Sequence, residues 1–491
     1  MGIDRKEYPT IIQGGMGAGV SSWRLARSVS LTGQLGVVSG TALNLIMARR
    51  LQQGDPGGHM RRALQHFPLP EVAARIVDRY FVAGGKPADK PFKAVPISSF
   101  PLSRDFEEMT VAANFAEVFL AKEGHDGLVG VNYLEKIQLP TLPSIYGAML
   151  AGIDFILMGA GIPKSIPGVL DLFGQGKPAQ LKIDVKDAPR DAEYCVHFDP
   201  QAFLGQEPPL LLRPKFLAII SSATLGAVLA KRSNGRVDGF VVEGPTAGGH
   251  NAPPRGPLQL NSLGEPIYTE RDEADIPALV ALNLPFWLAG SYAEPHRVAE
   301  ALAAGAHGVQ VGTAFAYCEE SDLYTELKRT VLEKTCLEGV QVFTDPVASP
   351  TGFPFKVVRL EGTLTEDECY RERDRICDLA YLRHGYYAPD GSVGWRCPAE
   401  PVADYLRKGG CEADTEGRKC LCNALLANLG LGQVRGGSVR EKPLVTSGMD
   451  AQNLARFLGR KELSYSAREV VDYLLSGLPQ PEPALTAVTV G

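Results

Sequence analysis

The sequence predicts an α/β protein built on a (β/α)8 TIM barrel, with large insertions and a C-terminal, mainly helical extension. Two observations predict this fold. Eight short apolar runs recur along the chain, most of them followed by glycine or a small polar residue, and several lead into a helical pattern. The chain has 491 residues, whereas one such barrel needs roughly 250, so the remainder must form insertions or an added segment.

The eight apolar runs are the expected strands. Their apolar residues do not alternate with polar ones, as Phe286-Trp287-Leu288 illustrates, which is typical of strands buried on both faces of a parallel sheet. Strand–helix alternation repeated eight times indicates a closed barrel. In chain order the expected strands cover residues 11–13, 36–38, 128–132, 155–158, 217–221, 239–243, 286–289 and 308–311.

Helix signals stand between these runs. A helix is expected from Ser22 to Val29, because Gly33 follows as a stop signal. Before the last strand, Pro295 sits where a first helical turn accepts proline, and Gly305 ends the pattern. The helices therefore fall where crossovers between parallel strands require them.

Two segments interrupt the repeat. Residues 45–115 read as a largely helical insertion, and residues 174–214 as a proline-rich one with a hairpin around 181–185. Both follow strands at the C-terminal side of the barrel, so we expect both to cover the active site. The strand–helix repeat stops near residue 346. This point divides the chain into a barrel (1–345) and an extension (346–491). Late in the extension, Ser466 and Glu469 have the spacing of a capping box at a helix start.

Composition restricts the class of protein. Hydrophobic residues make up 45% and charged residues 22%, the mix of a globular protein. The net charge of −6 argues against nucleic acid or a membrane surface as partner. The sequence contains no apolar run of about 18 residues, and its start lacks the apolar core of a secretory signal. We therefore expect a cytoplasmic protein with a small-molecule substrate; the sequence leaves a homo-oligomer open.

Glycines gather at the strand ends, where barrel enzymes perform their chemistry. Gly290-Ser291 and Gly312-Thr313 follow the seventh and eighth strands, the usual phosphate site of barrels, where backbone N–H groups face an anion. The same pairs also fit plain tight turns, so both interpretations stay open.

The loop after the sixth strand holds the most specific pattern, Ala247-Gly248-Gly249-His250. A histidine at this point can enter the barrel mouth and exchange a proton near neutral pH. The alternative is a structural histidine that bonds the loop backbone.

Five motifs occur in an order that resembles a known family. They are Gln13-Gly14-Gly15-Met16-Gly17, Gly130-Val131-Asn132, Ala247-Gly248-Gly249-His250, Ala289-Gly290-Ser291 and Gly308-Val309-Gln310-Val311-Gly312-Thr313. Over roughly residues 8–330 the chain is similar to the FMN-dependent nitronate monooxygenases, also called 2-nitropropane dioxygenases. The resemblance implies that residues 1–345 form a barrel that binds FMN without covalent attachment.

The resemblance also implies roles for particular residues. Gly15, Met16 and Gly17 would lie against the flavin through backbone atoms, Asn132 would bond the isoalloxazine region, and Gly248 and Gly249 belong to the same cofactor site. Gly290, Ser291, Gly312 and Thr313 would hold the phosphate, and His250 would take the proton from the carbon beside the nitro group. The implied activity is oxidation of alkyl nitronates with dioxygen to a carbonyl compound and nitrite.

Three departures from the family pattern keep other activities open. Asn251 stands where the family often has arginine, the first insertion is large, and the extension has no counterpart there. One alternative is an NAD(P)H-dependent flavin reductase that acts on quinones or on a carrier-bound enoyl substrate. Another is a partner-binding subunit without turnover. An arginine cluster in the first insertion could bind an acidic carrier or a phosphorylated substrate, or could simply form a solvated helix face. Its members are Arg49, Arg50, Arg61, Arg62, Arg75 and Arg79.

Six of the nine cysteines lie between Cys369 and Cys422. Four thiolates could hold zinc or an iron–sulfur cluster, and the hypothetical ligand set is Cys397, Cys411, Cys420 and Cys422. Because their spacing matches no standard ligand pattern, the favoured interpretation is buried thiols, and the predicted site includes no metal.

Overall fold

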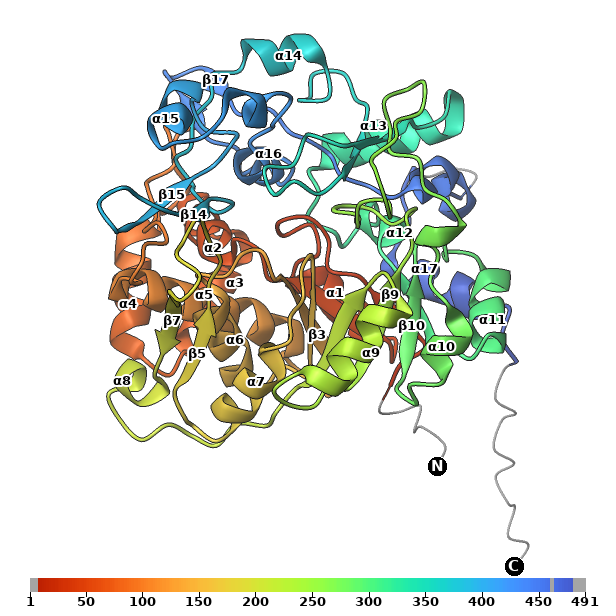
Figure 1. Ribbon diagram of the computed structural model, residues 1–491, viewed down its shortest axis with the longest axis horizontal. Helices are drawn as coiled ribbons and strands as arrows, with labels where there is room; N and C mark the ends of the chain where they lie inside the picture. Colours follow the sequence, from red (N-terminus) through yellow and green to blue (C-terminus); the bar gives the residue numbers. More distant parts are fainter. Residues whose placement is uncertain (1–7, 460–462, 480–491) are drawn as a thin grey trace, which may run out of the picture.

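A computed structural model describes residues 8–459 and 463–479 and contains a closed eight-stranded parallel barrel (Figure 1). Its strands neighbour one another in the order β1-β11-β10-β9-β8-β4-β3-β2. This confirms the predicted fold class, and every expected strand is present. The barrel strands are β1 (Ile11–Gln13), β2 (Leu35–Ser39), β3 (Val129–Leu134), β4 (Phe155–Gly159), β8 (Lys215–Ile220), β9 (Gly239–Glu243), β10 (Phe286–Ala289) and β11 (Gly308–Val311).

Alternate residues of these strands form two separate apolar layers. Ile12, Leu157 and Trp287 belong to a small buried cluster that fills the barrel, while their neighbours face the surrounding helices. The Trp287 indole N–H donates to the Pro9 carbonyl oxygen at 2.8 Å, which satisfies the polar atom of that side chain. The barrel is thus a packed core, and free space for chemistry exists only beyond the strand ends.

Helices surround the barrel as the crossovers require (Figure 1). Helix α1 occupies Trp23–Ser30, close to its predicted span. Helix α11 begins at Pro295, and Gly305, with φ of 95°, follows its end. The other helices of this layer are α5 (Arg104–Lys122), α6 (Thr141–Leu150), α7 (Ile166–Gly174), α9 (Ala223–Arg232), α10 (Ile276–Val280) and α12 (Thr313–Ala316).

The first insertion is helical, as predicted. It contains α2 (Leu43–Gln52), the 3-10 turn η1 (Pro56–Gly58), α3 (His59–Gln65) and α4 (Pro70–Tyr80), which pack with one another and against α5. Its arginines face partners within the chain. Arg49 donates to the Leu431 carbonyl oxygen, and the other five pair with carboxylates, namely Arg50 with Glu117 and Asp322, Arg61 with Asp55, Arg62 with Glu123, Arg75 with Glu108 and Arg79 with Asp105. Their charges are therefore matched internally.

The expectation of a hairpin around residues 181–185 is wrong, because the two neighbouring strands at this point do not pair with each other. Strand β5 (Ala179–Lys182) pairs antiparallel with β7 (Cys195–Phe198), and the Ile183 N–H continues this pairing by donating to the Tyr194 carbonyl oxygen at 2.9 Å. The chain therefore cannot reverse at residue 183. The next strand, β6 (Val185–Lys186), pairs with β14 (His384–Tyr387) of the extension instead. The short helix α8 (Pro200–Leu204) completes this insertion.

The extension is mainly helical, as predicted, and it also contains several short strands. The barrel segment ends with α13 (Thr325–Leu337) and β12 (Val342–Asp345). The strands of the extension are β13 (Phe355–Val358), β14, β15 (Val393–Arg396), β16 (Val434–Arg435) and β17 (Val439–Arg440). Its helices are α14 (Asp367–Glu372), α15 (Val402–Arg407), η3 (Glu412–Thr415), α16 (Leu421–Ala427), η4 (Met449–Phe457) and α17 (Ala467–Leu475), and α17 begins with the predicted Ser466–Glu469 capping box.

The extension leaves the barrel and then returns to it. In Figure 1 its first part gathers around α14, α15 and α16, and α17 lies beside α11. Helix α17 contacts α1, α11 and α12. Residues near the start of η4 thereby reach the mouth of the barrel. In the part of the chain that the structure describes, no helix is both long and apolar enough to cross a membrane.

A buried ion-pair cluster joins the first insertion to the segment after α12. Arg50 Nη1 lies 3.0 Å from Glu117 Oε2, Nη2 contacts Asp322, and the arginine side chain is only 15% exposed. Removing one member of a buried cluster leaves an uncompensated charge. We therefore expect Arg50→Ala to lower the free energy of unfolding by roughly 3 kcal/mol or more, measured by urea denaturation.

Arg24 is the matched control, since it approaches the same Asp322 at 3.8 Å but is 52% exposed. Arg24→Ala should cost only about 0–1 kcal/mol. Equal losses in the two variants would contradict the assignment of a buried cluster.

Candidate active site

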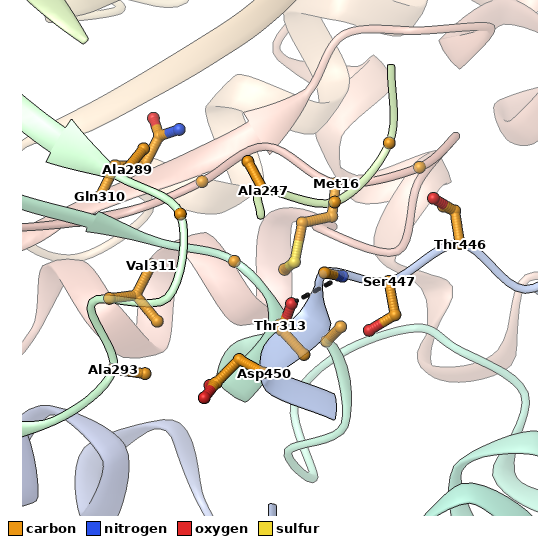
Figure 2. A pocket seen from close by; sticks show the side chains of 18 of the residues that line it. Met16, Ala247, Ala289, Ala293, Gln310, Val311, Thr313, Thr446, Ser447 and Asp450 are labelled. Carbon is orange, nitrogen blue, oxygen red and sulfur yellow. Dashed lines mark hydrogen bonds between the residues drawn. The ribbon is translucent and has the colours of Figure 1, made fainter. Parts of the chain in front are cut away.

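A cavity opens at the carboxyl ends of β1, β9, β10 and β11 (Figure 2). Its empty volume is about 960 Å³, including space open to solvent. Nine of the ten residues predicted to bind the cofactor line it, namely Gly15, Met16, Gly17, Gly248, Gly249, Gly290, Ser291, Gly312 and Thr313. Loops from four strands thus bring together residues that are distant in sequence.

The loop after β1 depends on glycine. A Cβ atom on Gly15 would stand 2.5 Å from the Cβ of Asn132, and Gly17 has φ of 58°. Ser21 fixes this loop, because its hydroxyl accepts from the Met16 N–H at 2.9 Å and donates to the Gly14 carbonyl oxygen at 3.0 Å. The backbone of the loop can therefore approach a planar group closely.

The loops after β10 and β11 form the opposite wall. Gly290 has φ of 104°, and a Cβ atom there would stand 2.9 Å from Thr246 Oγ1. Ser291 follows with φ of 57°. The Thr313 hydroxyl accepts the Gly448 N–H at 3.0 Å, which ties this wall to the extension (Figure 2).

The remaining predicted residue, Asn132, lies behind the β1 loop instead of in the cavity wall. Its Nδ2 donates to the Gly15 carbonyl oxygen at 3.2 Å, while its Oδ1 is buried and has no partner within the described chain. Gln310 Oε1, in the cavity wall, is a second buried acceptor without a partner there. Buried acceptors are normally bonded, and of these two only Gln310 belongs to the cavity wall, where a donor from a bound group would complete it.

His250 is held by the extension. Its backbone forms an antiparallel bridge with Phe355, and its Nε2 is hydrogen-bonded to Ser349 Oγ at 2.7 Å. The ring is absent from the cavity wall and packs on the Phe355 ring, with 4.7 Å between centroids. Burial lowers the pKa of His250 to about 4. The imidazole is therefore neutral at pH 7, the protonation state that a general base needs, and the role of His250 in proton transfer stays a prediction.

Glu243, at the end of β9, is the carboxylate that the barrel strands contribute to the cavity wall, and Asp450 of the extension is a second one. Burial raises the pKa of Glu243 to about 7, and the charge of Lys356 opposes this rise. The sequence analysis placed residue 243 at the end of the sixth strand but did not select Glu243 as a site residue. Its position at the carboxyl end of a barrel strand was the available signal.

Lys356 comes from β13 of the extension and is buried beside this loop. Its ammonium donates to the Pro245 carbonyl oxygen and to Asn251 Oδ1, the latter at 2.8 Å. Burial lowers the pKa of Lys356 to about 8, with Glu243 acting in the opposite direction. No sequence pattern linked this lysine to the barrel.

The extension, not the insertions, covers the cavity. Thr446, Ser447, Gly448 and Asp450 line it, and no residue of 45–115 or 174–214 does (Figure 2). The expectation that both insertions cover the site is therefore wrong. The insertions pack along the flank of the barrel, whereas the chain before η4 crosses its mouth.

The hypothetical ligand set of four cysteines is also wrong. Cys411 is exposed at the start of η3, and all nine cysteines are free thiols. Within residues 8–459 and 463–479, no group of three or more His, Cys, Asp or Glu side chains is arranged to hold a metal ion.

Comparison with known proteins identifies a related family. Residues 211–349 match the family model described as nitronate monooxygenase, which confirms the resemblance over that segment. A probable nitronate monooxygenase of Bacillus subtilis is 37% identical over 114 residues, covering 23% of this chain and 30% of that protein. The match includes β8 to β11, which carry most of the cavity wall.

Two further relatives were found. A (3aS,4S,5R,7aS)-5-hydroxy-7a-methyl-1-oxo-octahydro-1H-indene-4-carboxyl-CoA dehydrogenase of Mycobacterium tuberculosis is 28% identical over 195 residues, covering 39% of this chain and 50% of that protein. The structure of a nitroalkane oxidase from Streptomyces ansochromogenes superposes with a TM-score of 0.46 at 14% identity, covering 96% of this chain and 97% of that one. The chain spans between 30% and 50% of the length of the curated relatives it matches.

The raised pKa of Glu243 predicts a pH-dependent stability. The folded chain keeps the proton up to about pH 7, while an unfolded glutamate loses it near its ordinary value of 4.5. Between these values the folded state binds more protons, so stability falls as pH rises. Relative to Glu243→Gln, wild type should therefore lose roughly 2 kcal/mol of unfolding free energy from pH 5 to pH 8.

Urea denaturation at the two pH values measures this difference. Glu300→Gln serves as control, because its carboxylate is 56% exposed and lies outside the cavity wall. An identical pH dependence in wild type and Glu243→Gln would contradict the burial of this carboxyl.

Proposed function

We propose that the chain is a flavin-dependent oxidoreductase that holds FMN in the cavity between the β1 loop and the β10 and β11 loops. The observation that carries the proposal is the glycine loop after β1, which admits a planar group, beside Gln310 of the same cavity wall, whose buried Oε1 has no partner within the described chain. An isoalloxazine ring is planar and carries an N–H donor.

The opposite wall of the cavity, formed by the β10 and β11 loops, is suited to bind a phosphate. Backbone N–H groups at the ends of barrel strands bind anions, and Gly290, Ser291, Gly312 and Thr313 all line the cavity. Gly290 and Ser291 have positive φ values, which turn the backbone sharply at the end of β10. We assign the FMN phosphate to this wall and the ring to the β1 loop.

For the substrate we propose alkyl nitronates, oxidised with dioxygen to a carbonyl compound and nitrite. FMN, when bound, supplies the redox chemistry. The chain's own residues bind and orient the substrate and manage the proton. With a pKa of about 7 in the cavity wall, Glu243 is suited to take the proton from the carbon beside the nitro group when the substrate arrives as a neutral nitroalkane.

An NAD(P)H-dependent reductase is the second candidate, with a quinone or an enoyl thioester as acceptor. The observation that favours it is the match to dehydrogenases named for a CoA-linked substrate in Rhodococcus jostii and Mycobacterium tuberculosis. A thioester substrate of that kind would enter the same cavity.

An anaerobic donor screen separates the candidates. Purified protein should be yellow, with close to one FMN per chain, and its flavin absorbance should bleach on mixing with an alkyl nitronate but not with NADPH. Bleaching by NADPH alone would support the reductase. Absence of flavin after reconstitution of folded protein would overturn the proposal as a whole.

The base is tested with a neutral nitroalkane as substrate. We expect kcat/KM to fall below about pH 7 as Glu243 is protonated, and Glu243→Gln to lower it roughly 10²–10⁴-fold. The same variant should oxidise a preformed nitronate at close to the wild-type rate, because no carbon proton remains to be removed.

His250→Ala is the comparison variant, since the resemblance gives that histidine the base role. The pKa of His250 is about 4. If His250 were the base, the wild-type kcat/KM would therefore not change with pH from pH 5 upward. Two results would assign the base role to His250. One is a wild-type kcat/KM that does not fall below pH 7; the other is a fall in kcat/KM that persists in Glu243→Gln and disappears in His250→Ala.

A further inference from the structure

A second cleft lies where the extension meets the second insertion and the loop after β3. Its empty volume is about 1450 Å³, including space open to solvent. It is lined by residues 136–140 of that loop, 184–186 around β6, 350–352, and 380–385 at the start of β14. Among the described residues, none lines both this cleft and the cavity assigned to FMN. The two are therefore separate sites, and we call the second one the extension cleft.

Four cationic side chains line the extension cleft, namely Lys136, Lys186, Arg383 and Arg418. Within the described chain none of them is paired with a carboxylate. The Lys136 ammonium lies 5.1 Å from the centroid of the Phe353 ring, and both arginines donate to backbone carbonyl oxygens. In the first insertion, by contrast, five of the six arginines pair with carboxylates. The positive charge of the cleft is therefore available to a ligand.

The acidic side chains of the cleft do not cancel this charge. They are Asp184 and Asp414, and each accepts a hydrogen bond from a neutral group, Asp184 from Gln138 Nε2 and Asp414 from the Tyr405 hydroxyl, both at 3.2 Å. His384 adds no charge, because its Nε2 accepts a guanidinium N–H. Four cations against two carboxylates leave a net charge of +2 in the wall.

The polar groups of the cleft that lack a partner are donors. Trp395 lines the cleft, and its buried indole N–H has no acceptor within the described chain. Neither the Lys136 nor the Lys186 ammonium is hydrogen-bonded to a described residue. Buried donors are normally bonded, so the wall is complementary to a ligand that carries several acceptor oxygens.

Apolar and aromatic surface adjoins these donors. Tyr381, Leu382 and Trp395 belong to the same wall. Sites for organic molecules are concave and mainly apolar, with a few polar groups that fix the orientation of the ligand. The extension cleft therefore has a surface for the body of an organic ligand beside a surface for its anionic group.

We propose that the extension cleft binds an organic phosphate ester, a ligand site beyond the proposed function. A phosphate monoester carries roughly −1.5 to −2 charges at pH 7 and three strong acceptor oxygens, which match the net charge and the open donors of the wall. Lysine and arginine bind such oxygens through charge-assisted hydrogen bonds. A single carboxylate would neutralise only half of the net charge.

The extension cleft adjoins the residues that hold His250. Thr351 lines the cleft, and its hydroxyl is hydrogen-bonded to Ser349 Oγ at 2.8 Å. Ser349 Oγ is in turn hydrogen-bonded to His250 Nε2 at 2.7 Å. Arg418, also in the cleft wall, donates to the Ser349 carbonyl oxygen at 2.6 Å. A ligand in the cleft would therefore contact the segment that positions His250.

Isothermal titration calorimetry with phenyl phosphate, inorganic phosphate and benzoate tests the proposal. The protein is saturated with FMN first, so that the phosphate wall of the cavity is occupied. Phenyl phosphate should bind more tightly than inorganic phosphate, which lacks the aromatic body, and more tightly than benzoate, which carries one charge. Because both ammonium groups would contact the phosphate, the double variant Lys136→Gln/Lys186→Gln should weaken its binding roughly tenfold.

Lys164→Gln/Lys177→Gln is the matched control, since it removes the same charge from two exposed lysines outside the cleft. Equal affinities of the two double variants for phenyl phosphate would overturn the proposal, as would wild type that does not bind it at millimolar concentration. Benzoate bound as tightly as phenyl phosphate would overturn the assignment of a phosphate. Flavin absorbance of the same samples shows whether FMN fills its cavity, so failure of the FMN site and failure of the cleft are told apart.

Discussion

The buried ammonium of Lys356 joins the extension to the barrel, and the candidate site depends on it. A buried charge is tolerated only with close partners, and here they are the Pro245 carbonyl oxygen, Asn251 Oδ1 and the nearby charge of Glu243. These partners belong to the loop after β9, whereas Lys356 belongs to β13. Satisfying this one charge therefore fixes the loop against the extension.

The closure of the cavity follows from the same contact. Strand β13 carries the Phe355 bridge to His250, and the Thr446 hydroxyl donates to the Lys356 carbonyl oxygen at 2.7 Å. From there the chain reaches Gly448, whose N–H bonds Thr313. A Cβ atom on Gly248 would stand 2.6 Å from the Gly448 nitrogen, so the two loops meet without side chains between them. The glycine pattern of the barrel is thus matched to the extension as well as to a cofactor.

The extension lies almost entirely beyond the segment that matches the family model, which ends at residue 349. Beyond that point the chain supplies the cover of the cavity and the buried Lys356. TIM barrels commonly acquire new substrates by variation of the segments that cover the strand ends, while the barrel itself is retained.

The barrel and most of its site were predictable from the sequence, because strand runs, helix stops and glycine loops are local patterns. Gly15, Gly290 and Thr313 could be placed at strand ends before any contact was known. Long-range packing decided the rest. The pKa values of His250 and Glu243 depend on burial beneath distant segments. Lys356 acquires its surroundings only when the extension folds back onto the barrel, and such contacts between distant segments produce no periodic pattern in the sequence.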